Sequence, residues 1–144
     1  MEETLKEKSL NSATVEILEK DNRFSPFSVL DERIRLALRC ADDKKGIGIV
    51  VLDLRDITSF TEFFVIVSGL NIRQVQAISD DIDEKLKKQL NEKSLRIEGY
   101  SSAEWVLMDY GDFIVHIFEN KARDTYDLER LWRDAKKVEL PKEL

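Results

Sequence analysis

Five short apolar segments of the chain have the composition and spacing of β-strands. Residues 49–54 (IVVLDL) and 63–67 (FFVIV) are branched or aromatic and nearly all apolar, as expected of strands covered on both faces. Residues 95–100 are predicted to form a third strand, and residues 105–109 and 113–118 to pair as a hairpin. The pattern therefore predicts a mixed sheet of about five strands.

Apolar positions at helical spacing lie on both sides of the first two strands. Ser28 and Asp31 together resemble a helix start, and a stripe follows that consists of Leu30, Ile34, Ala37, Leu38 and Ala41. Asn71 and Gln74 resemble a second start, followed by Val75, Ile78, Ile82, Leu86 and Leu90. Residues 119–132 return to helical spacing. The fold class is therefore α/β (α+β), with helices that flank the sheet.

These elements divide the chain into three parts. Residues 1–27 are expected to be an N-terminal extension that is helical or flexible, with weak helical spacing of Leu10, Ala13, Thr14, Ile17 and Leu18. Residues 28–135 form one folded domain. Residues 136–144 are expected to be a charged, frayed tail.

Composition narrows the possible partners. The chain of 144 residues has a net charge of −6 and a sequence pI near 5.0, which opposes direct binding to DNA or to other phosphate backbones. A basic protein is a better match for an acidic surface. No apolar run reaches the roughly 20 residues of a membrane span, and no secretory signal is visible, so we expect a cytoplasmic protein without a membrane partner.

Candidate catalytic groups are few. Asp53 and Asp56 flank a strand end, where α/β proteins often place metal-binding carboxylates, but no second acidic cluster is expected to meet them. The chain has one cysteine, one histidine and no glycine-rich phosphate-binding motif. His116 lies in a strand without a nearby nucleophile, which favours a structural or interface role. We therefore expect no enzyme activity, no metal and no cofactor.

The segment from Ala103 to Phe118 (AEWVLMDYGDFIVHIF) contains a large aromatic residue near its start and the histidine near its end. Strand alternation places Trp105, Leu107 and Asp109 on one face of the sheet, with the residues between them on the other. An outward Trp105 would be a binding anchor, whereas an inward one would be core. The pattern leaves both interpretations open.

Several long motifs in one order resemble the Iojap family of ribosomal silencing factors (RsfS). They are DDKKGIGIVVLDLRDITSFTEFFVIVSG, RQVQAISDDI, EGYSSAEWVLMDYGDFIVHIF and ARDTYDLERLW. The resemblance covers about Leu30 to Ala135 and leaves out residues 1–27.

The resemblance implies a fold related to nucleotidyltransferases but without their catalytic residues. It also implies binding to the large ribosomal subunit through its universal ribosomal protein fourteen, which sterically blocks joining of the small subunit and represses translation under nutrient limitation. Carried onto this chain, the family's contact region contains Tyr100, Trp105, Leu107, Asp109 and Asp112. Trp105 and Leu107 would supply apolar anchors, and Asp109 would meet a basic side chain.

Two other functions remain as alternatives. A divergent, metal-dependent nucleotidyltransferase would use Asp53, Asp56 and a magnesium ion. A homodimeric adaptor would bury the Trp105 face against a second copy. Family members are commonly dimers, so the resemblance also makes a homodimer compatible with silencing.

Overall fold

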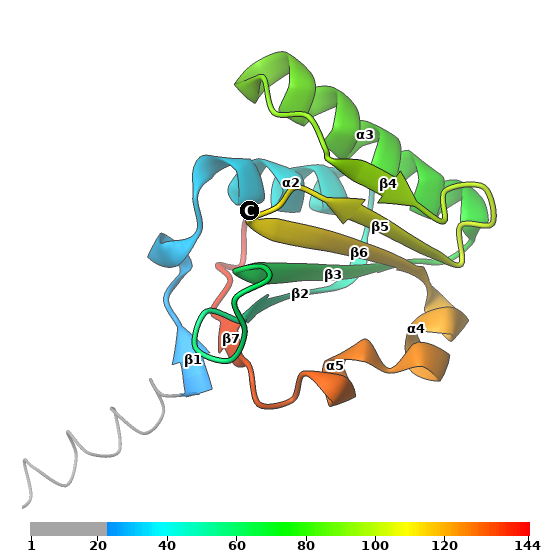
Figure 1. Ribbon diagram of the computed structural model, residues 1–144. Helices are drawn as coiled ribbons and strands as arrows, with labels where there is room; N and C mark the ends of the chain where they lie inside the picture. The colour runs from blue at the N-terminus through cyan, green and yellow to red at the C-terminus, as the bar shows by residue number, and fades with distance from the viewer. Residues whose placement is uncertain (1–22) are drawn as a thin grey trace, which may run out of the picture.

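The computed structural model describes residues 23–144, in which one sheet lies between two groups of helices (Figure 1). The helix expected between residues 10 and 18 lies outside the described residues. Within residues 23–144, no helix combines the length and the apolar character needed to span a bilayer.

The sheet has seven strands in the order β1-β7-β2-β3-β6-β5-β4. Their bounds are β1 Phe24–Ser25, β2 Ile47–Asp53, β3 Phe63–Gly69, β4 Arg96–Glu98, β5 Trp105–Asp109, β6 Phe113–Glu119 and β7 Lys136–Val138. The central strands β3 and β6 run parallel, and β2 and β5 pair with them in antiparallel orientation. The mixed sheet and its five expected strands are thus confirmed.

Strands β1 and β7 are additions to the predicted sheet. The two strands pair in parallel with each other, and β7 also pairs antiparallel with the end of β2. The expectation of a frayed tail is therefore wrong for Lys136–Val138, where backbone pairing and the buried side chain of Val138 hold the chain in place. The sequence does not indicate this strand, because two of its three residues are lysines. Pairing at a sheet edge needs only backbone groups and leaves no apolar pattern.

Helices α2 (Glu32–Asp43) and α3 (Ile72–Leu90) cover one face of the sheet (Figure 1). The side chain of Asp31 caps α2 by accepting hydrogen bonds from the backbone N–H groups of Arg33 and Ile34, so the helix begins after Asp31 rather than at Ser28. Ser28 lies in the short 3₁₀ helix η1 (Phe27–Val29). Asn71 caps α3 as predicted. All five apolar positions of the predicted α2 stripe are buried.

The opposite face carries two short helices, α4 (Asn120–Tyr126) and α5 (Leu128–Leu131). The predicted helical segment is interrupted at Asp127, whose backbone has the left-handed φ of 48°. Leu128 is buried against the sheet, whereas Tyr126 and Leu131 are exposed. Because α4 and α5 are much shorter than α2 and α3, they leave part of this face uncovered.

The two faces differ in how completely they are buried. Under α2 and α3, the sheet contributes Val65, Val106 and Met108, all with no exposed area, to a large core. We call this the closed face. The face next to α4 and α5 has a smaller core around Phe64, Ile66 and Phe118. Trp105, Leu107 and Trp132 pack against this core and are only partly buried. We call this the open face.

Candidate functional site

Strand β5 divides its side chains between the two faces. Val106 and Met108 are fully buried on the closed face, while Trp105, Leu107 and Asp109 on the open face are each partly exposed. The predicted alternation is confirmed, and the apolar core occupies one side of this strand. The other side offers an aromatic, an aliphatic and an acidic side chain in a row.

The indole of Trp105 is held by three neighbours. Its ring stacks on Phe118, its cross-strand partner, with centroids 5.0 Å apart and planes 29° apart. Tyr126 of α4 lies 4.9 Å away at a tilt of 50°. The indole Nε1–H donates a hydrogen bond of 3.0 Å to Nδ1 of His116. Trp105 is therefore partly exposed but fixed in orientation.

His116 lies beneath this surface and is only 3% exposed. Burial lowers the pKa of its imidazole to about 3, so the ring is neutral at physiological pH. The ring meets Phe64 edge to face, with centroids 4.4 Å apart. Its Nδ1 is occupied by the indole of Trp105. A buried neutral ring between aromatic side chains agrees with a structural or interface histidine rather than a general base.

A second aromatic group extends the open face beyond strand β5. Trp132 packs edge to face on Phe64 at 5.4 Å, and Phe60 lies 5.8 Å from Trp132. Phe60 is 57% exposed although it is a large apolar residue. Phe60, Tyr126 and Trp132 were not among the predicted site residues. The signal for Phe60 was an aromatic residue within the polar connector between two strands.

Asp109 has partners within the chain for both of its carboxylate oxygens. Oδ1 accepts a hydrogen bond of 2.8 Å from the backbone N–H of Gly111, and Oδ2 lies 3.4 Å from Nε of Arg96. The Asp109 side chain is 18% exposed and that of Arg96 is 61% exposed. An ion pair with so exposed a partner is weak, so an external cation can compete with Arg96 for Asp109.

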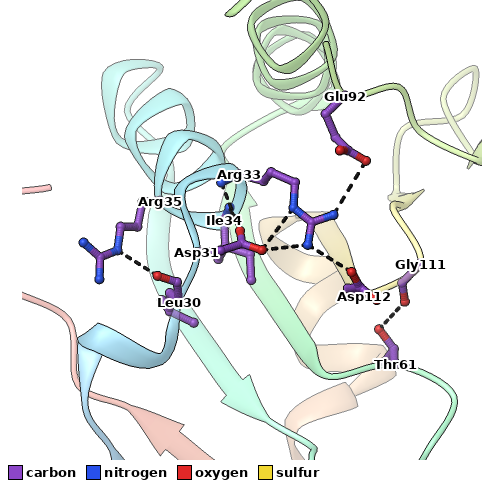
Figure 2. Close-up of polar contacts among 9 residues, drawn as sticks. All are labelled: Leu30, Asp31, Arg33, Ile34, Arg35, Thr61, Glu92, Gly111 and Asp112. Atoms are coloured by element: carbon purple, nitrogen blue, oxygen red, sulfur yellow. Dashed lines mark hydrogen bonds and ion pairs between the residues drawn. The ribbon is translucent and has the colours of Figure 1, made fainter. Parts of the chain in front are cut away.

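Asp112 lies at the turn between β5 and β6, where it contacts helix α2 (Figure 2). Its side chain is 61% exposed, and Oδ2 accepts a hydrogen bond of 3.0 Å from Nη2 of Arg33. Arg33 also pairs with Asp31 at 2.6 Å and with Glu92 at 3.6 Å. The hydrogen bond from Arg33 to Asp31, together with these other carboxylates, raises the pKa of the guanidinium. Asp112 therefore belongs to a polar cluster that joins the turn to α2 and the end of α3.

Tyr100 lies on the side of the sheet covered by α3. Its hydroxyl donates a hydrogen bond of 3.1 Å to Asp80, and its carbonyl oxygen accepts one of 2.9 Å from Nε2 of Gln76. Both partners are on α3, so Tyr100 is on the opposite side from the indole of Trp105. Of the five predicted site residues, the structure brings Trp105, Leu107 and Asp109 together and places Tyr100 and Asp112 elsewhere.

A shallow pocket of about 280 Å³ lies beside Trp105 on the open face. It is lined by Glu98, Gly99, Trp105 and Leu107. Trp105 and Leu107 supply apolar walls, and the exposed carboxylate of Glu98 lies 3.3 Å from Nε of Arg96, the same guanidinium that lies near Asp109. Glu98 was not among the predicted site residues.

The carboxylates proposed for an enzyme have structural partners. Asp53 accepts a hydrogen bond of 2.6 Å from Ser25 and two from the guanidinium of Arg55, at 2.9 and 2.8 Å. Burial favours a raised pKa for Asp53, but the hydrogen bonds from Arg55 and Ser25 outweigh it and hold the pKa below its usual value. Asp56 pairs with Lys136 at 3.2 Å. Both carboxylates connect β2, or the loop after it, to the added edge strands.

The described residues offer little for metal binding or thiol chemistry. In the part of the chain that the structure describes, no group of three or more His, Cys, Asp or Glu side chains is arranged to hold a metal ion. Cys40 is buried in α2, and burial raises the pKa of its thiol to about 12. The thiol is therefore protonated at neutral pH and a poor nucleophile.

Comparison with known proteins agrees with the motif resemblance. The family model described as "Ribosomal silencing factor during starvation" matches residues 28–144. A ribosomal silencing factor RsfS from Halalkalibacterium halodurans is 43% identical over 112 residues, which are 76% of this chain and 92% of that protein. The mouse protein named mitochondrial assembly of ribosomal large subunit protein 1 is 32% identical over 87 residues, which are 58% of this chain and 38% of that protein.

A solved structure is similar to this chain in fold and in sequence. The crystal structure of a protein from Chromobacterium violaceum superposes with a TM-score of 0.68 at 35% sequence identity. The match covers 78% of this chain and 89% of that one.

Proposed function

Because this chain belongs to the family of ribosomal silencing factors, we propose that it binds the large ribosomal subunit and sterically prevents the small subunit from joining. Translation would then be repressed when nutrients are scarce, in agreement with the family description. The name of the mouse relative, which mentions the ribosomal large subunit, supports the choice of subunit. A partner on the ribosome is also compatible with the expected cytoplasmic location.

The single observation that carries this proposal is the open face of the sheet. It presents Trp105 and Leu107 partly exposed on β5, together with the carboxylate of Asp109, and the exposed ring of Phe60 lies against Trp132 farther along the same face. Aromatic anchors that are half-buried and fixed in orientation are typical of residues that dominate binding energy. We propose that the partner is universal ribosomal protein fourteen and that it covers this face.

The predicted contact residues take different parts in this proposal. Trp105 and Leu107 are the apolar anchors, and Asp109 meets a basic side chain of the ribosomal protein in place of Arg96. Tyr100 and Asp112 act at the margin, because Tyr100 is bound to α3 and Asp112 to Arg33. Asp112 supports the contact mainly by fixing the turn that follows Asp109.

Occlusion needs no bond to be made or broken. A standard interface buries about 800 Å² on each partner, enough to attach a domain of this size firmly. The bound domain would then occupy space that the small subunit must enter. The internal partners of Asp53 and Asp56 give no support to a nucleotidyltransferase reaction.

Co-sedimentation with isolated large subunits tests the proposal. The purified chain is centrifuged through a sucrose gradient with large subunits, small subunits are then added, and joined ribosomes are quantified. We expect the chain to travel with the large subunit and to reduce joining. The exposed Leu70, between β3 and α3, provides a control variant, Leu70→Ala, which should behave as the unmodified chain. A chain that stays at the top of the gradient would refute the proposal.

A homodimer through the same face is a second candidate, favoured by the exposed aromatic surface around Phe60 and Trp105. If both partners use the open face, dimerisation and ribosome binding are mutually exclusive. Size-exclusion chromatography at increasing protein concentration, with and without universal ribosomal protein fourteen, distinguishes this case. Dimers that persist in the complex would contradict a shared surface.

A further inference from the structure

The contact between Trp105 and His116 joins two strands on the open face. In the register of β5 and β6, Trp105 lies opposite Phe118, and Leu107 lies opposite His116. The indole of Trp105 therefore reaches diagonally across the strand pair to the imidazole. This hydrogen bond, 3.0 Å long, is the one polar contact of the indole among the described residues.

The direction of this hydrogen bond determines the form of the histidine. An indole nitrogen can only donate, so Nδ1 of His116 must accept and carries no proton. The neutral ring must then carry its proton on Nε2, which has no acceptor among the described residues. The aromatic side chains next to the ring are Phe64, Trp105 and Phe118, none of which carries a charge, and burial lowers the pKa of the imidazole.

We propose that His116 is a positioning residue: its Nδ1 fixes the orientation of the Trp105 indole and so prepares the open face for its macromolecular partner. This inference rests on the proposed function, because it explains how the main anchor is held before the partner arrives. A side chain already fixed in its bound orientation loses less entropy on binding.

The other two contacts of Trp105 cannot replace this hydrogen bond. Phe118 stacks on the indole and Tyr126 packs against it at a tilt, but both contacts are also compatible with an indole flipped about χ2. The hydrogen bond to Nδ1 specifies which edge of the indole points inward. The opposite edge is then presented to the partner.

Two substitutions separate positioning from packing. His116→Leu keeps an apolar side chain in the strand but removes the acceptor, whereas His116→Asn places an amide oxygen as many bonds from the backbone as Nδ1. Net hydrogen bonds contribute about 0.5–1.5 kcal/mol, which corresponds to an affinity change of roughly 2- to 13-fold. We expect His116→Leu to weaken binding to large subunits by that factor and His116→Asn to stay within about twofold of the unmodified chain.

Hydrogen exchange at the Trp105 indole N–H distinguishes the two roles of His116, because replacing a residue that only fills space would not change it. Trp132→Phe leaves a single indole, so the ¹H–¹⁵N spectrum of that variant reports Trp105 alone. We expect this N–H to be protected from hydrogen exchange, and its protection relative to a free indole at the same pH should not change between pH 5 and 8, because His116 does not titrate there. Adding His116→Leu should speed the exchange, and adding His116→Asn should restore it.

Each result has a definite meaning. An indole whose exchange is equally slow with Leu at 116, or equal affinities of all three chains, would overturn the positioning role. If the Leu variant fails to fold, fast indole exchange in the Trp132→Phe chain would overturn the role by itself. If the unmodified chain does not bind large subunits at all, the proposed function fails, but the exchange experiment still decides whether His116 holds Trp105.

Discussion

The closed and open faces are formed by the same strands, yet they are covered differently. Helix α3 (19 residues) and helix α2 (12 residues) cover one face, whereas α4 and α5 together supply 11 residues to the other. The closed face therefore has the larger, fully buried core, and the open face leaves the rings of Trp105 and Trp132 partly exposed around a smaller one. The difference suggests that stability resides mainly on one side of the sheet and recognition on the other.

The largest expected effect on stability belongs to the closed face. Ile78 of α3 has no exposed area, and its replacement by Ala creates a cavity that should lower the free energy of unfolding by about 2–5 kcal/mol. Chemical denaturation measures this change. The matched control is Ile72→Ala on the same helix, because Ile72 is exposed and its loss should cost less than about 0.5 kcal/mol. Equal effects of the two substitutions would show that this face is not the main source of stability.

The open face should show the opposite balance between stability and binding. Trp105→Ala removes the main anchor and should weaken binding to large subunits by about 2 kcal/mol or more, roughly 30-fold. The free energy of unfolding should fall by a smaller amount, because the indole is partly exposed and loses stacking on Phe118 and Tyr126. Titration by co-sedimentation and denaturation give the two numbers. A folded variant that binds as well as the unmodified chain would show that Trp105 is not an anchor.

A charge reversal at the margin of the open face should have a smaller effect. Asp109→Lys places a positive charge where we propose a basic partner, and binding should weaken by about 1–2 kcal/mol. The substitution also removes the acceptor for the N–H of Gly111, so stability should fall by about 1 kcal/mol. Asp42→Lys, an equal charge change at an exposed site on α2, is the control. Similar losses of binding for both variants would indicate a general charge effect.

The sequence predicted the elements that have a clear apolar pattern, either a continuous apolar run or helical spacing. Strands β2, β3 and β6 and helix α3 were predicted because burial imposes a regular pattern on them. Strand β7 was missed because its pairing with β1 and β2 uses backbone groups, which are the same for almost every residue type. A short edge strand leaves almost no pattern in the sequence.

The candidate site was predictable only in part, for a similar reason. Alternation along β5 grouped Trp105, Leu107 and Asp109 correctly, but which face is open depends on the lengths of distant helices. Tyr100 and Asp112 belong to the same stretch of sequence, yet their partners are 20 and 79 residues away along the chain. Such long-range contacts are set by the completed fold and not by local spacing.

The smallest expected effect concerns the polar edge of the closed face, where Asp53 joins Ser25 and Arg55. Because hydrogen bonds hold its pKa below the unfolded value of about 3.9, Asp53 stabilises the folded chain above that pH. This stabilisation is lost as the pH falls through the folded pKa. Asp53→Asn should therefore lower stability at pH 7 by about 1 kcal/mol and have less effect near pH 2.

Urea denaturation of the Asp53→Asn and Asp56→Asn variants at several pH values measures this dependence. Asp56→Asn is the control, because Asp56 is a neighbouring carboxylate with a largely exposed side chain paired with Lys136. Its effect should be near zero at every pH, since exposed ion pairs contribute little. A loss for Asp53→Asn that is equal at pH 7 and pH 2 would mean that the shape of the side chain, and not its charge, joins β1 to the sheet. The edge would then depend on packing, as the rest of the closed face does.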